Sequence, residues 1–393
     1  MTVETATKIS QLNALNPAGS DPKSEGDNHL RLLKSCLQSV FDDSGTTLKT
    51  TLPIESPAGA IVGGKPVLTA RRTNKVVNGA MLISQENGNT ASGPAATPYF
   101  AADQFFEFQT TAQILAQRVQ IRTLNNSTDR FQMNVSAAKA SLAAGDQFLI
   151  GQNIEAARIA DLGWGTAAAR QAVLVFGWRA PAGTYSVVIL NDASSRTWIG
   201  TFTITAGQAN ADTTQVMVIP GDTAGTWTTG NARGMQLYWA LAVGTTYTSA
   251  VTGWQAGQFY AGPGQINGCA TVNNTFLLSD VGLYSDPDNT GLPPPWEYPD
   301  YTVELMECQR YFSGINPYLI GGYAGAGQGV IVDFPFKVLM RTTSSVSVTT
   351  PTYSNASGIT VNSSGTYMTR LQITIAAAGY GYAFSGFSAN ARM

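Results

Sequence analysis

From about residue 76 to the C-terminus, apolar runs of strand length alternate with clusters of turn-forming residues. The apolar runs include "AVLVFGWRA" (172–180), "TYSVVILN" (184–191) and "GMQLYWALA" (234–242), and Gly, Pro, Asn and Asp fill the gaps, as in "IPGDTAGTW" (219–227). Many short strands with few long helical patterns predict an antiparallel β-sandwich or jelly roll. No fixed repeat of about 20–50 residues is present, which disfavours a solenoid or a propeller.

The fold class predicted is therefore mainly β, with a domain boundary in the proline-rich stretch "GLPPPWEYPD" (291–300). We assign residues 76–300 to a jelly-roll domain and residues 301–393 to a smaller C-terminal β-domain. The latter begins with "VELMECQRYF" (303–312), which predicts a short helix that leads into a strand. Further strands are expected at "MLISQEN" (81–87) and in the Gly- and Tyr-rich tail.

The N-terminal segment differs from the rest, because "SEGDNHLRLLKSCLQSVF" (24–41) has apolar residues at helical spacing. One apolar stripe on a lone helix needs a partner to be stable. We therefore predict that residues 1–45 attach the chain to copies of itself or to another protein, and that residues 46–75 form an extended linker or stalk. The predicted contact residues are His29, Leu30, Leu33, Leu37 and Phe41.

Bulk composition excludes several partners. The net charge is −2 and only 12% of residues are charged, so no positive field attracts nucleic acid. The longest apolar runs are too short to span a bilayer, and the N-terminus lacks a secretory signal pattern.

Three widely spaced cysteines, Cys36, Cys269 and Cys308, fit neither a disulfide framework nor a zinc site. We expect buried free thiols and assembly in a reducing cytosol.

The sequence contains few residues that could act in catalysis or bind a metal. The single histidine, His29, lies in the N-terminal helix, remote in sequence from the β-domains, which argues against histidine-based catalysis and zinc. Glycoside hydrolysis needs only two carboxylates. The candidates are Asp103, Glu107, Asp146, Glu155, Asp192 and Asp280. Most lie beside turn signals, where structural roles explain them. We predict no catalytic residues, no bound metal and no cofactor, and leave a structural calcium in the turns open.

Aromatic residues offer a binding function, because rings stack on the faces of sugars. Trp178, Trp198 and Trp239 lie inside apolar strands and are predicted core residues. The surface candidates lie in turn-like or glycine-rich sequence, and we predict that they bind glycans. They are Trp227, Trp254, Tyr318, Tyr323, Tyr380 and Tyr382.

Several segments resemble tailed-bacteriophage fibre and appendage proteins. Residues 9–41 match their opening signature at Asp21, Gly26, Asp27, His29, Leu30, Arg31 and Lys34. "NGAMLISQENG" (78–88), "GQNIE" (151–155), "IPGDTAGTW" (219–227) and "ELMECQRYF" (304–312) are similar to motifs of their lectin-like jelly-roll modules. Residues 278–298 depart from the usual exit of that module, and residues 42–75 match least.

This resemblance implies a non-enzymatic, homotrimeric virion fibre or spike, assembled in the host cytoplasm. Its N-terminus would attach to other virion proteins, at the tail, the baseplate or the capsid, and its distal domains would bind host-surface glycans. Two alternatives stay open: a head fibre that decorates the capsid, and a tailspike depolymerase that cuts surface polysaccharide. A free-standing secreted carbohydrate-binding module is disfavoured by the N-terminal helix.

Overall fold

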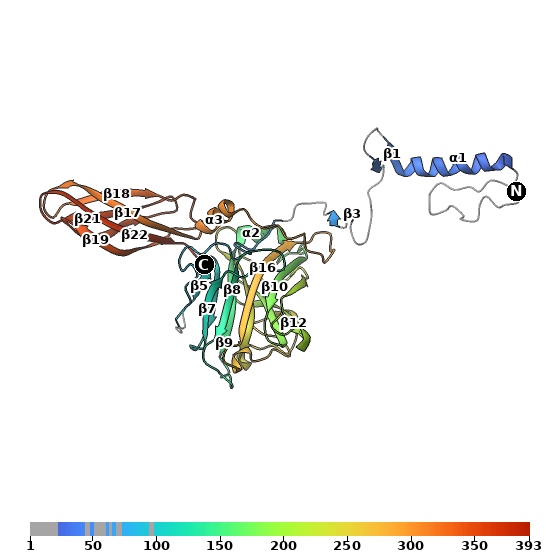
Figure 1. The fold of residues 1–393 in the computed structure, drawn as a ribbon, viewed down its shortest axis with the longest axis horizontal. Helices are drawn as coiled ribbons and strands as arrows, with labels where there is room; N and C mark the ends of the chain where they lie inside the picture. Colours follow the sequence, from blue (N-terminus) through green and yellow to red (C-terminus); the bar gives the residue numbers. More distant parts are fainter. Residues whose placement is uncertain (1–22, 44–47, 51–59, 63–64, 68–72, 94–97) are drawn as a thin grey trace. The chain divides into compact units, whose positions relative to one another are not determined.

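The protein is described by a computed structural model, which covers residues 23–43, 48–50, 60–62, 65–67, 73–93 and 98–393. The chain divides into two compact units, Met1–Ala70 and Arg71–Met393, each of which is described by itself (Figure 1). No helix in the described ranges is both long and apolar enough to cross a membrane.

The first unit contains the predicted N-terminal helix, α1 (Lys23–Val40). The short strands β1 (Phe41–Asp43) and β2 (Leu48–Thr50) pair antiparallel, as do β3 (Ala60–Val62) and β4 (Lys65–Val67). The helix prediction is confirmed, with one correction. Phe41 does not continue the helical stripe, because the helix ends at Val40 and Phe41 begins β1.

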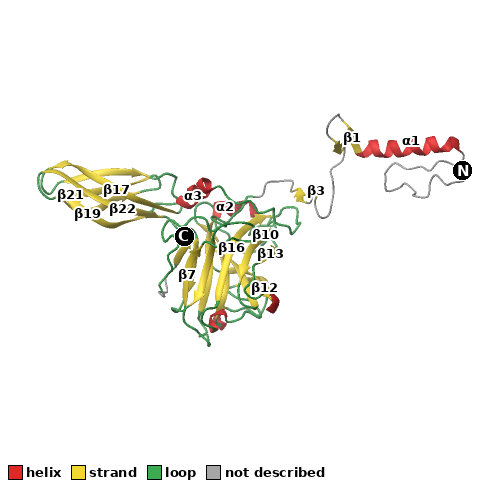
Figure 2. Cartoon of the chain, in the orientation of Figure 1, coloured by secondary structure: helices red, strands yellow, loops and turns green. Residues whose placement is uncertain are grey.

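The larger part of the second unit is a sandwich of two antiparallel sheets (Figure 2). The seven-stranded sheet runs in the order β15 (Gly253–Ala256), β12 (Arg196–Ile204), β11 (Gly183–Asn191), β14 (Arg233–Val243), β9 (Gln147–Glu155), β6 (Phe105–Gln109), β5 (Tyr99–Ala102). The five-stranded sheet runs in the order β13 (Thr213–Ile219), β10 (Ala172–Arg179), β16 (Thr275–Ser285), β8 (Arg130–Val135), β7 (Ile114–Val119).

The chain crosses repeatedly between these sheets, which gives the jelly-roll arrangement that the strand pattern predicted. Short helical turns connect some strands. They are α2 (Ala156–Ile159), η2 (Ala160–Leu162), η3 (Ala206–Gln208), η4 (Thr245–Tyr247) and η5 (Gly268–Ala270). The predicted core tryptophans are buried: Trp178 and Trp239 lie in the aromatic-rich core between the sheets, and Trp198 packs with them.

A smaller sandwich follows. After α3 (Tyr301–Gln309), six strands form two antiparallel sheets of three. One sheet has the order β17 (Phe312–Ala324), β22 (Gly379–Asn390), β19 (Ser345–Ser354), and the other β18 (Gly329–Pro335), β21 (Met368–Ile375), β20 (Ala356–Ser364). Side chains from both sheets, including Ile320, Leu371 and Phe387, form a separate core. The predicted helix leading into a strand is confirmed.

The strand predicted at residues 81–87 is wrong. These residues form a turn that is organised by the buried side chain of Asn78. Its Nδ2 donates to the carbonyl oxygens of Ile83 (2.8 Å) and Asp103 (2.9 Å), and its Oδ1 accepts from the Ile83 backbone N–H (3.0 Å). The apolar residues of this segment are buried without joining a sheet, because a side chain satisfies the backbone groups that a sheet would otherwise pair.

Side chains from both sandwiches meet around α3 and the end of β9. Buried Glu155 accepts from Arg310 Nη2 (2.6 Å) and Nε (3.0 Å) and from Tyr311 Oη (2.8 Å). The carboxylate of Glu304 accepts from the Asn78 backbone N–H. Cys308 packs with Tyr311 in a small apolar cluster and, like Cys269, is a buried free thiol, as predicted for these two cysteines.

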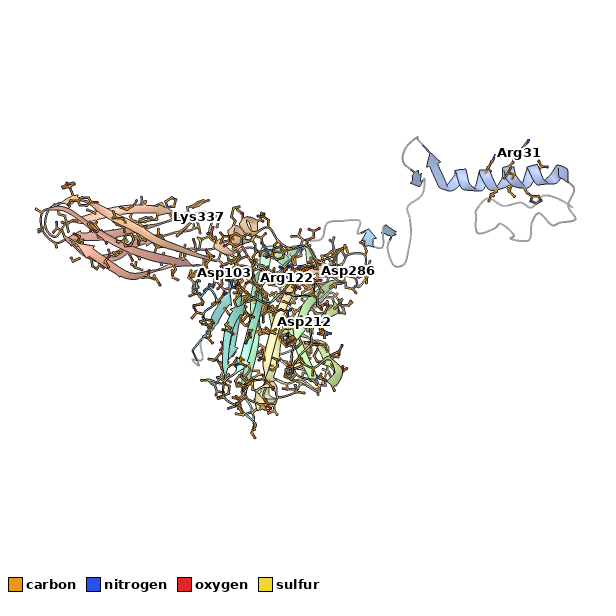
Figure 3. The ribbon with its side chains drawn as sticks, viewed as in Figure 1. Arg31, Asp103, Arg122, Asp212, Asp286 and Lys337 are labelled. Carbon is orange, nitrogen blue, oxygen red and sulfur yellow. The ribbon has the colours of Figure 1, made fainter. Side chains whose placement is uncertain are left out.

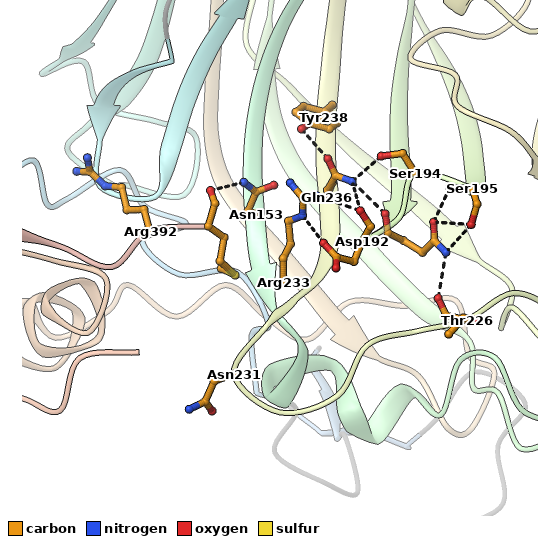
Figure 4. A network of polar contacts seen from close by, with 12 residues as sticks. Asn153, Asp192, Ser194, Ser195, Thr226, Asn231, Arg233, Gln236, Tyr238 and Arg392 are labelled. Carbon is orange, nitrogen blue, oxygen red and sulfur yellow. Dashed lines mark hydrogen bonds and ion pairs between the residues drawn. The ribbon is translucent and has the colours of Figure 1, made fainter. Parts of the chain in front are cut away.

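The C-terminal residues also lie in this contact region between the two sandwiches, which we call the joint. Asn153 Nδ2 donates to the carbonyl oxygen of Met393 at 2.8 Å (Figure 4). The guanidinium of Arg392 lies over the rings of Phe100 (3.8 Å) and Phe312 (4.1 Å), one from each sandwich. The segments 78–88, 151–155 and 304–312, which carry the family resemblance, all contribute to this joint.

Candidate functional site

The outward face of β17 and β22 in the C-terminal sandwich carries a group of exposed aromatic side chains. Along β22 the side chains alternate: Gly381, Ala383 and Phe387 are buried, whereas Tyr380 and Phe384 are exposed. This alternation follows from the two-residue period of a strand with one buried face. We call the outward residues Leu319, Tyr323, Tyr380, Tyr382 and Phe384 the tyrosine face.

Three tyrosines that the sequence predicted separately meet on this face. Tyr323 pairs with Tyr380 across β17 and β22, and their ring centroids lie 5.2 Å apart with planes tilted by 55°. The Tyr380 and Tyr382 centroids lie 6.2 Å apart with a tilt of 43°. Tyr323 is 82% exposed and Tyr380 45% exposed. The tilted rings present both edges and faces to solvent.

Glycine makes room for this arrangement. Gly321 lies opposite Tyr382 in the β17–β22 ladder. A Cβ atom at Gly321 would lie 2.7 Å from Tyr380 Oη and 3.0 Å from Tyr382 Cβ. The tyrosine side chains therefore use the space that any other residue at 321 would occupy. The glycine-rich sequence "GGYAGAGQG" (321–329) supplies this space and the turn from β17 into β18.

Asn355 fixes the backbone where β22 begins. Its Nδ2 donates to the carbonyl oxygens of Ala377 (2.9 Å) and Tyr380 (3.0 Å), and its Oδ1 accepts from the Ala377 backbone N–H (2.9 Å). This clamp holds Tyr380, whose ring contacts those of both Tyr323 and Tyr382. Thr352 and Ser354 of β19 lie opposite Phe384 and Tyr382, so the same face also carries hydroxyl groups. Sequence reasoning missed Asn355 and Phe384; alternation along β22 is the signal that identifies Phe384.

Tyr318 does not belong to this face. It lies on the inner side of β17, where its ring packs against Phe334 (4.5 Å between centroids) and Phe387 (5.0 Å). Burial raises the pKa of its phenol to about 12, and its Oη is a buried polar atom without a hydrogen-bond partner. Its position is that of a core residue.

The two candidate tryptophans lie together in the jelly roll, far from the tyrosine face in sequence. Trp227 and Trp254 are half-buried, with ring centroids 5.8 Å apart, and both pack edge-to-face against buried Trp164. Trp227 Nε1 donates to Asp222 (3.0 Å), and Trp254 Nε1 donates to the Pro220 carbonyl (2.7 Å). Both indole N–H groups are thus used within the chain, and the rings close a corner of the core.

A second group of aromatic side chains lies on the outer face of the seven-stranded sheet. We call Phe100, Phe106, Tyr238, Tyr260 and Tyr247 the aromatic row; successive ring centroids are separated by 5.5, 6.0, 5.4 and 5.5 Å. Tyr238 and Tyr260 are buried, and Tyr238 Oη donates to Gln236 Oε1 (3.1 Å), part of a polar network shown in Figure 4. The segment after β14 lies over this face and supplies Tyr247 and Tyr260 to the row.

Of the predicted contact residues of α1, three have described side chains. His29 is buried, whereas Leu30 and Leu33 are 49% and 40% exposed. The side chains of Leu37 and Phe41 lie outside the described residues. Two apolar residues of the predicted stripe are therefore exposed within this unit. The binding of this stripe to another chain stays a prediction.

The carboxylates weighed as catalytic candidates have structural partners. Asp103 Oδ1 accepts from the Gln85 backbone N–H (2.9 Å), and burial raises its pKa. Burial raises the pKa of Glu107 to about 7; its carboxylate accepts from Ser92 and Gln109. The others bind neighbouring donors: Asp146 with Lys139, Glu155 with Arg310, Asp192 with Arg233, and Asp280 with Asn125.

These carboxylates tie strands and loops together, as the turn signals beside them suggested. In the part of the chain that the structure describes, no three His, Cys, Asp or Glu side chains group as metal ligands would. Figure 3 labels Asp103, which belongs to the jelly roll, and Lys337, which follows β18 in the C-terminal sandwich. The tyrosine face is the group of predicted site residues that the fold brings together.

No protein-family model matches the sequence, and no curated protein matches it. Similar solved structures include the enzymatically active domain of tailspike protein 4 of bacteriophage CBA120, with 11% identity, a TM-score of 0.30 and coverage of 54% of this chain. The match covers 21% of the tailspike chain. The family 11 carbohydrate-binding module of a Clostridium thermocellum cellulase has 7% identity and a TM-score of 0.25, over 51% of this chain and 96% of the module.

A third similar structure is TmCBM61 in complex with β-1,4-galactotriose, with 8% identity and a TM-score of 0.26. It covers 50% of this chain and 99% of the module.

Proposed function

We propose that the chain is a non-enzymatic bacteriophage appendage protein that binds host-surface glycans through its C-terminal sandwich. The observation that carries the binding proposal is the tyrosine face, in which Tyr323, Tyr380 and Tyr382 lie together and accessible on one sheet. Exposed aromatic rings beside hydroxyl groups are suited to sugars, because a sugar has both apolar C–H surfaces and hydroxyls.

The virion role is supported by the resemblance of residues 9–41 to the attachment end of phage fibres and by α1. Exposed Leu30 and Leu33 on α1 give that helix apolar surface to bury against a partner. We propose that α1 attaches the chain to other virion proteins and that three chains associate. Several copies of a weak glycan site would bind a cell surface together far more tightly than one.

Binding is tested with the full-length chain, labelled fluorescently and mixed with cells of the phage host. The double variant Tyr323→Ala/Tyr380→Ala is expected to lose most cell binding. Tyr367→Ala is the matched control, because Tyr367 is also an exposed tyrosine of the C-terminal sandwich (72%) but precedes β21 in the other sheet. Equal binding by the double variant and the wild type would exclude the tyrosine face as the receptor site.

The virion role is tested by electron cryomicroscopy of the intact particle and by sedimentation of the purified protein. In the virion, we expect density for residues 1–45 at the tail or baseplate. In sedimentation, we expect the purified protein to be a trimer. Attachment to the capsid lattice would instead make the chain a head fibre. A fall in the viscosity of host polysaccharide on incubation with the pure protein would overturn the non-enzymatic assignment.

A further inference from the structure

The tyrosine face carries no charge. The sequences of its three strands, "FSGINPYLIGGYA" (β17), "GYGYAFSGFSAN" (β22) and "SVSVTTPTYS" (β19), contain no Asp, Glu, Lys, Arg or His. Residues 312–390 contain four charged side chains: Asp333, Lys337, Arg341 and Arg370. The ligand chemistry of the face therefore depends on where these four side chains lie.

None of the four belongs to a strand of this sheet. Asp333 and Arg370 pair with each other across β18 and β21 of the opposite sheet (2.6 Å). Arg341 donates to the backbone carbonyls of Asn231 (2.6 Å) and Ala391 (2.8 Å). Its side chain therefore binds at the joint between the two sandwiches. Lys337 follows the end of β18.

The charged contact of β17 lies at the end of the strand opposite Tyr323. Arg392 stacks on Phe312, the first residue of β17, and pairs with Glu86, whereas Tyr323 is the twelfth residue of that strand. A carboxylate or sulfate brought onto the tyrosine face would lose hydration against aromatic carbon without gaining a cationic partner. An uncharged sugar has no such penalty.

The face is elongated along β22. Tyr380, Tyr382 and Phe384 point outward at every second residue, which places the first and last about 13 Å apart. Tyr323 and Leu319 lie opposite the two ends of this line, and Gly321 lies opposite its centre. Gly321 has no side chain, and the space above it is occupied by the Tyr380 phenol oxygen and by Tyr382 Cβ, so the middle of the strip is formed by the tyrosines of β22. A strip of this length accommodates a run of linked sugars better than a single ring.

From the charge distribution and the shape of the strip, we infer that the ligand is an uncharged glycan chain that lies along β22, with sugar rings stacked on Tyr380, Tyr382 and Phe384. This inference rests on the proposed glycan-binding function and names the chemical class of its ligand. The acidic classes, such as uronic-acid and sialic-acid polymers, are excluded from this face by the lack of cations.

The test is affinity electrophoresis of the full-length protein in gels that contain one polysaccharide each. The neutral probes are mannan, galactan and dextran, and the acidic probes are hyaluronan, polygalacturonate and polysialic acid. We expect retardation by at least one neutral probe and by no acidic one. Tyr380→Ala should weaken that retardation about tenfold, whereas Tyr380→Phe, which keeps the ring, should retain it within about twofold.

Two further measurements are the dependence of glycan binding on salt concentration and on the length of the oligosaccharide. Binding of a neutral probe should be unchanged between about 50 mM and about 500 mM NaCl, because no ion pair is formed. Oligosaccharides of the retarding polymer should bind more tightly from the monosaccharide to the trisaccharide. Retardation by acidic probes that disappears in salt would overturn the inference and leave glycan binding standing.

The remaining outcomes are also decisive. If no polysaccharide retards the protein and host cells do not bind it, the proposed glycan-binding function itself fails. If Tyr323→Ala/Tyr380→Ala changes the number of chains per particle in sedimentation, the tyrosine face is a contact between subunits. If a neutral polymer retards wild type and Tyr380→Ala equally, the ligand binds elsewhere on the chain.

Discussion

The molecule contains two groups of stacked aromatic side chains on outer sheet faces, and they have opposite environments. The aromatic row of the jelly roll has ring spacings similar to those of the tyrosine face, yet Tyr238 and Tyr260 are almost fully buried. In the C-terminal sandwich, Tyr323 and Tyr380 are exposed. The difference is that a chain segment lies over the first face, whereas the three-stranded sheet has no such segment within its own connections.

The comparison teaches that the same arrangement of rings serves packing where chain covers it and is available for binding where chain does not. Gly262 N donates to Ser186 Oγ (2.9 Å), and Ile266 N to the Thr184 carbonyl (3.0 Å), which holds the covering segment on the jelly roll. The two faces are therefore expected to respond differently to equivalent substitutions, in stability for the first and in ligand binding for the second.

The largest effect is expected at the joint between the two regions. Glu155→Ala removes a buried carboxylate and leaves Tyr311 Oη and the Nε and Nη2 groups of Arg310 without their acceptor. We expect a loss of about 3–5 kcal/mol in the free energy of unfolding, measured by denaturant titration. A matched control is Asp333→Ala, which removes one partner of an exposed pair with Arg370. Similar losses in both variants would contradict a structural role for the joint.

A smaller effect is expected from truncating one ring in each group. Tyr238→Ala should lower the free energy of unfolding by about 3 kcal/mol, because it leaves a cavity beneath the covering segment and removes the hydroxyl that donates to Gln236 Oε1. Tyr380→Ala should change it by less than about 1 kcal/mol, because the side chain is half exposed. Thermal and denaturant unfolding of both variants measures this contrast. A large loss in Tyr380→Ala would mean that the tyrosine face is part of the core.

Two glycines provide a still finer comparison. A Cβ atom at Gly151 would lie 2.5 Å from the Tyr238 ring and 2.8 Å from the Phe106 ring, in a buried setting where neither ring can move away. Gly151→Ala should therefore cost about 1–3 kcal/mol of stability.

At Gly321 the nearest atom is the exposed phenol oxygen of Tyr380, which can swing into solvent. Gly321→Ala should cost less than about 1 kcal/mol of stability but weaken glycan binding, since it displaces the Tyr380 ring. Paired measurements of unfolding and of gel retardation on both variants decide the comparison. Loss of stability without loss of binding in Gly321→Ala would reverse our assignment of that face.

The smallest effect concerns pH. Burial raises the pKa of Glu107 in the jelly-roll core to about 7, so the folded protein binds a proton between about pH 4.5 and 7 that the unfolded chain releases. Stability contributed by this group is thus full at low pH and is lost as the pH rises toward 7. Glu107→Gln should remove that dependence and raise stability at pH 8 by about 1–2 kcal/mol. Denaturant midpoints at pH 5 and pH 8 give the measurement; an unchanged difference between the two pH values would refute it.

Much of the fold was predictable from local sequence. Alternating apolar runs identified most strands of the jelly roll, and Trp178 and Trp239 were correctly predicted as core because both lie inside apolar strands. The transition from α3 into β17 was also predictable. The strand β20 was missed, because "ASGITVNSS" is largely polar and has a bulge on each side of its centre. The apolar run at residues 81–87 predicts a strand, but the structure has a turn there, because Asn78, which lies outside the run, binds its backbone.

The candidate site was likewise predictable from the sequence only in part. The sequence by itself determined that Tyr323, Tyr380 and Tyr382 are surface candidates in glycine-rich sequence, since composition is a local property. It predicted loop-like segments there, whereas the structure places Tyr323 in β17 and the other two in β22. Only the tertiary structure decided that Tyr323 and Tyr380 pair, that Tyr318 points inward, and that Trp227 and Trp254 close a corner of the core. The physical reason is that exposure depends on which distant segment covers a face. Such contacts, like that of Glu155 with Arg310, join residues that no local pattern relates.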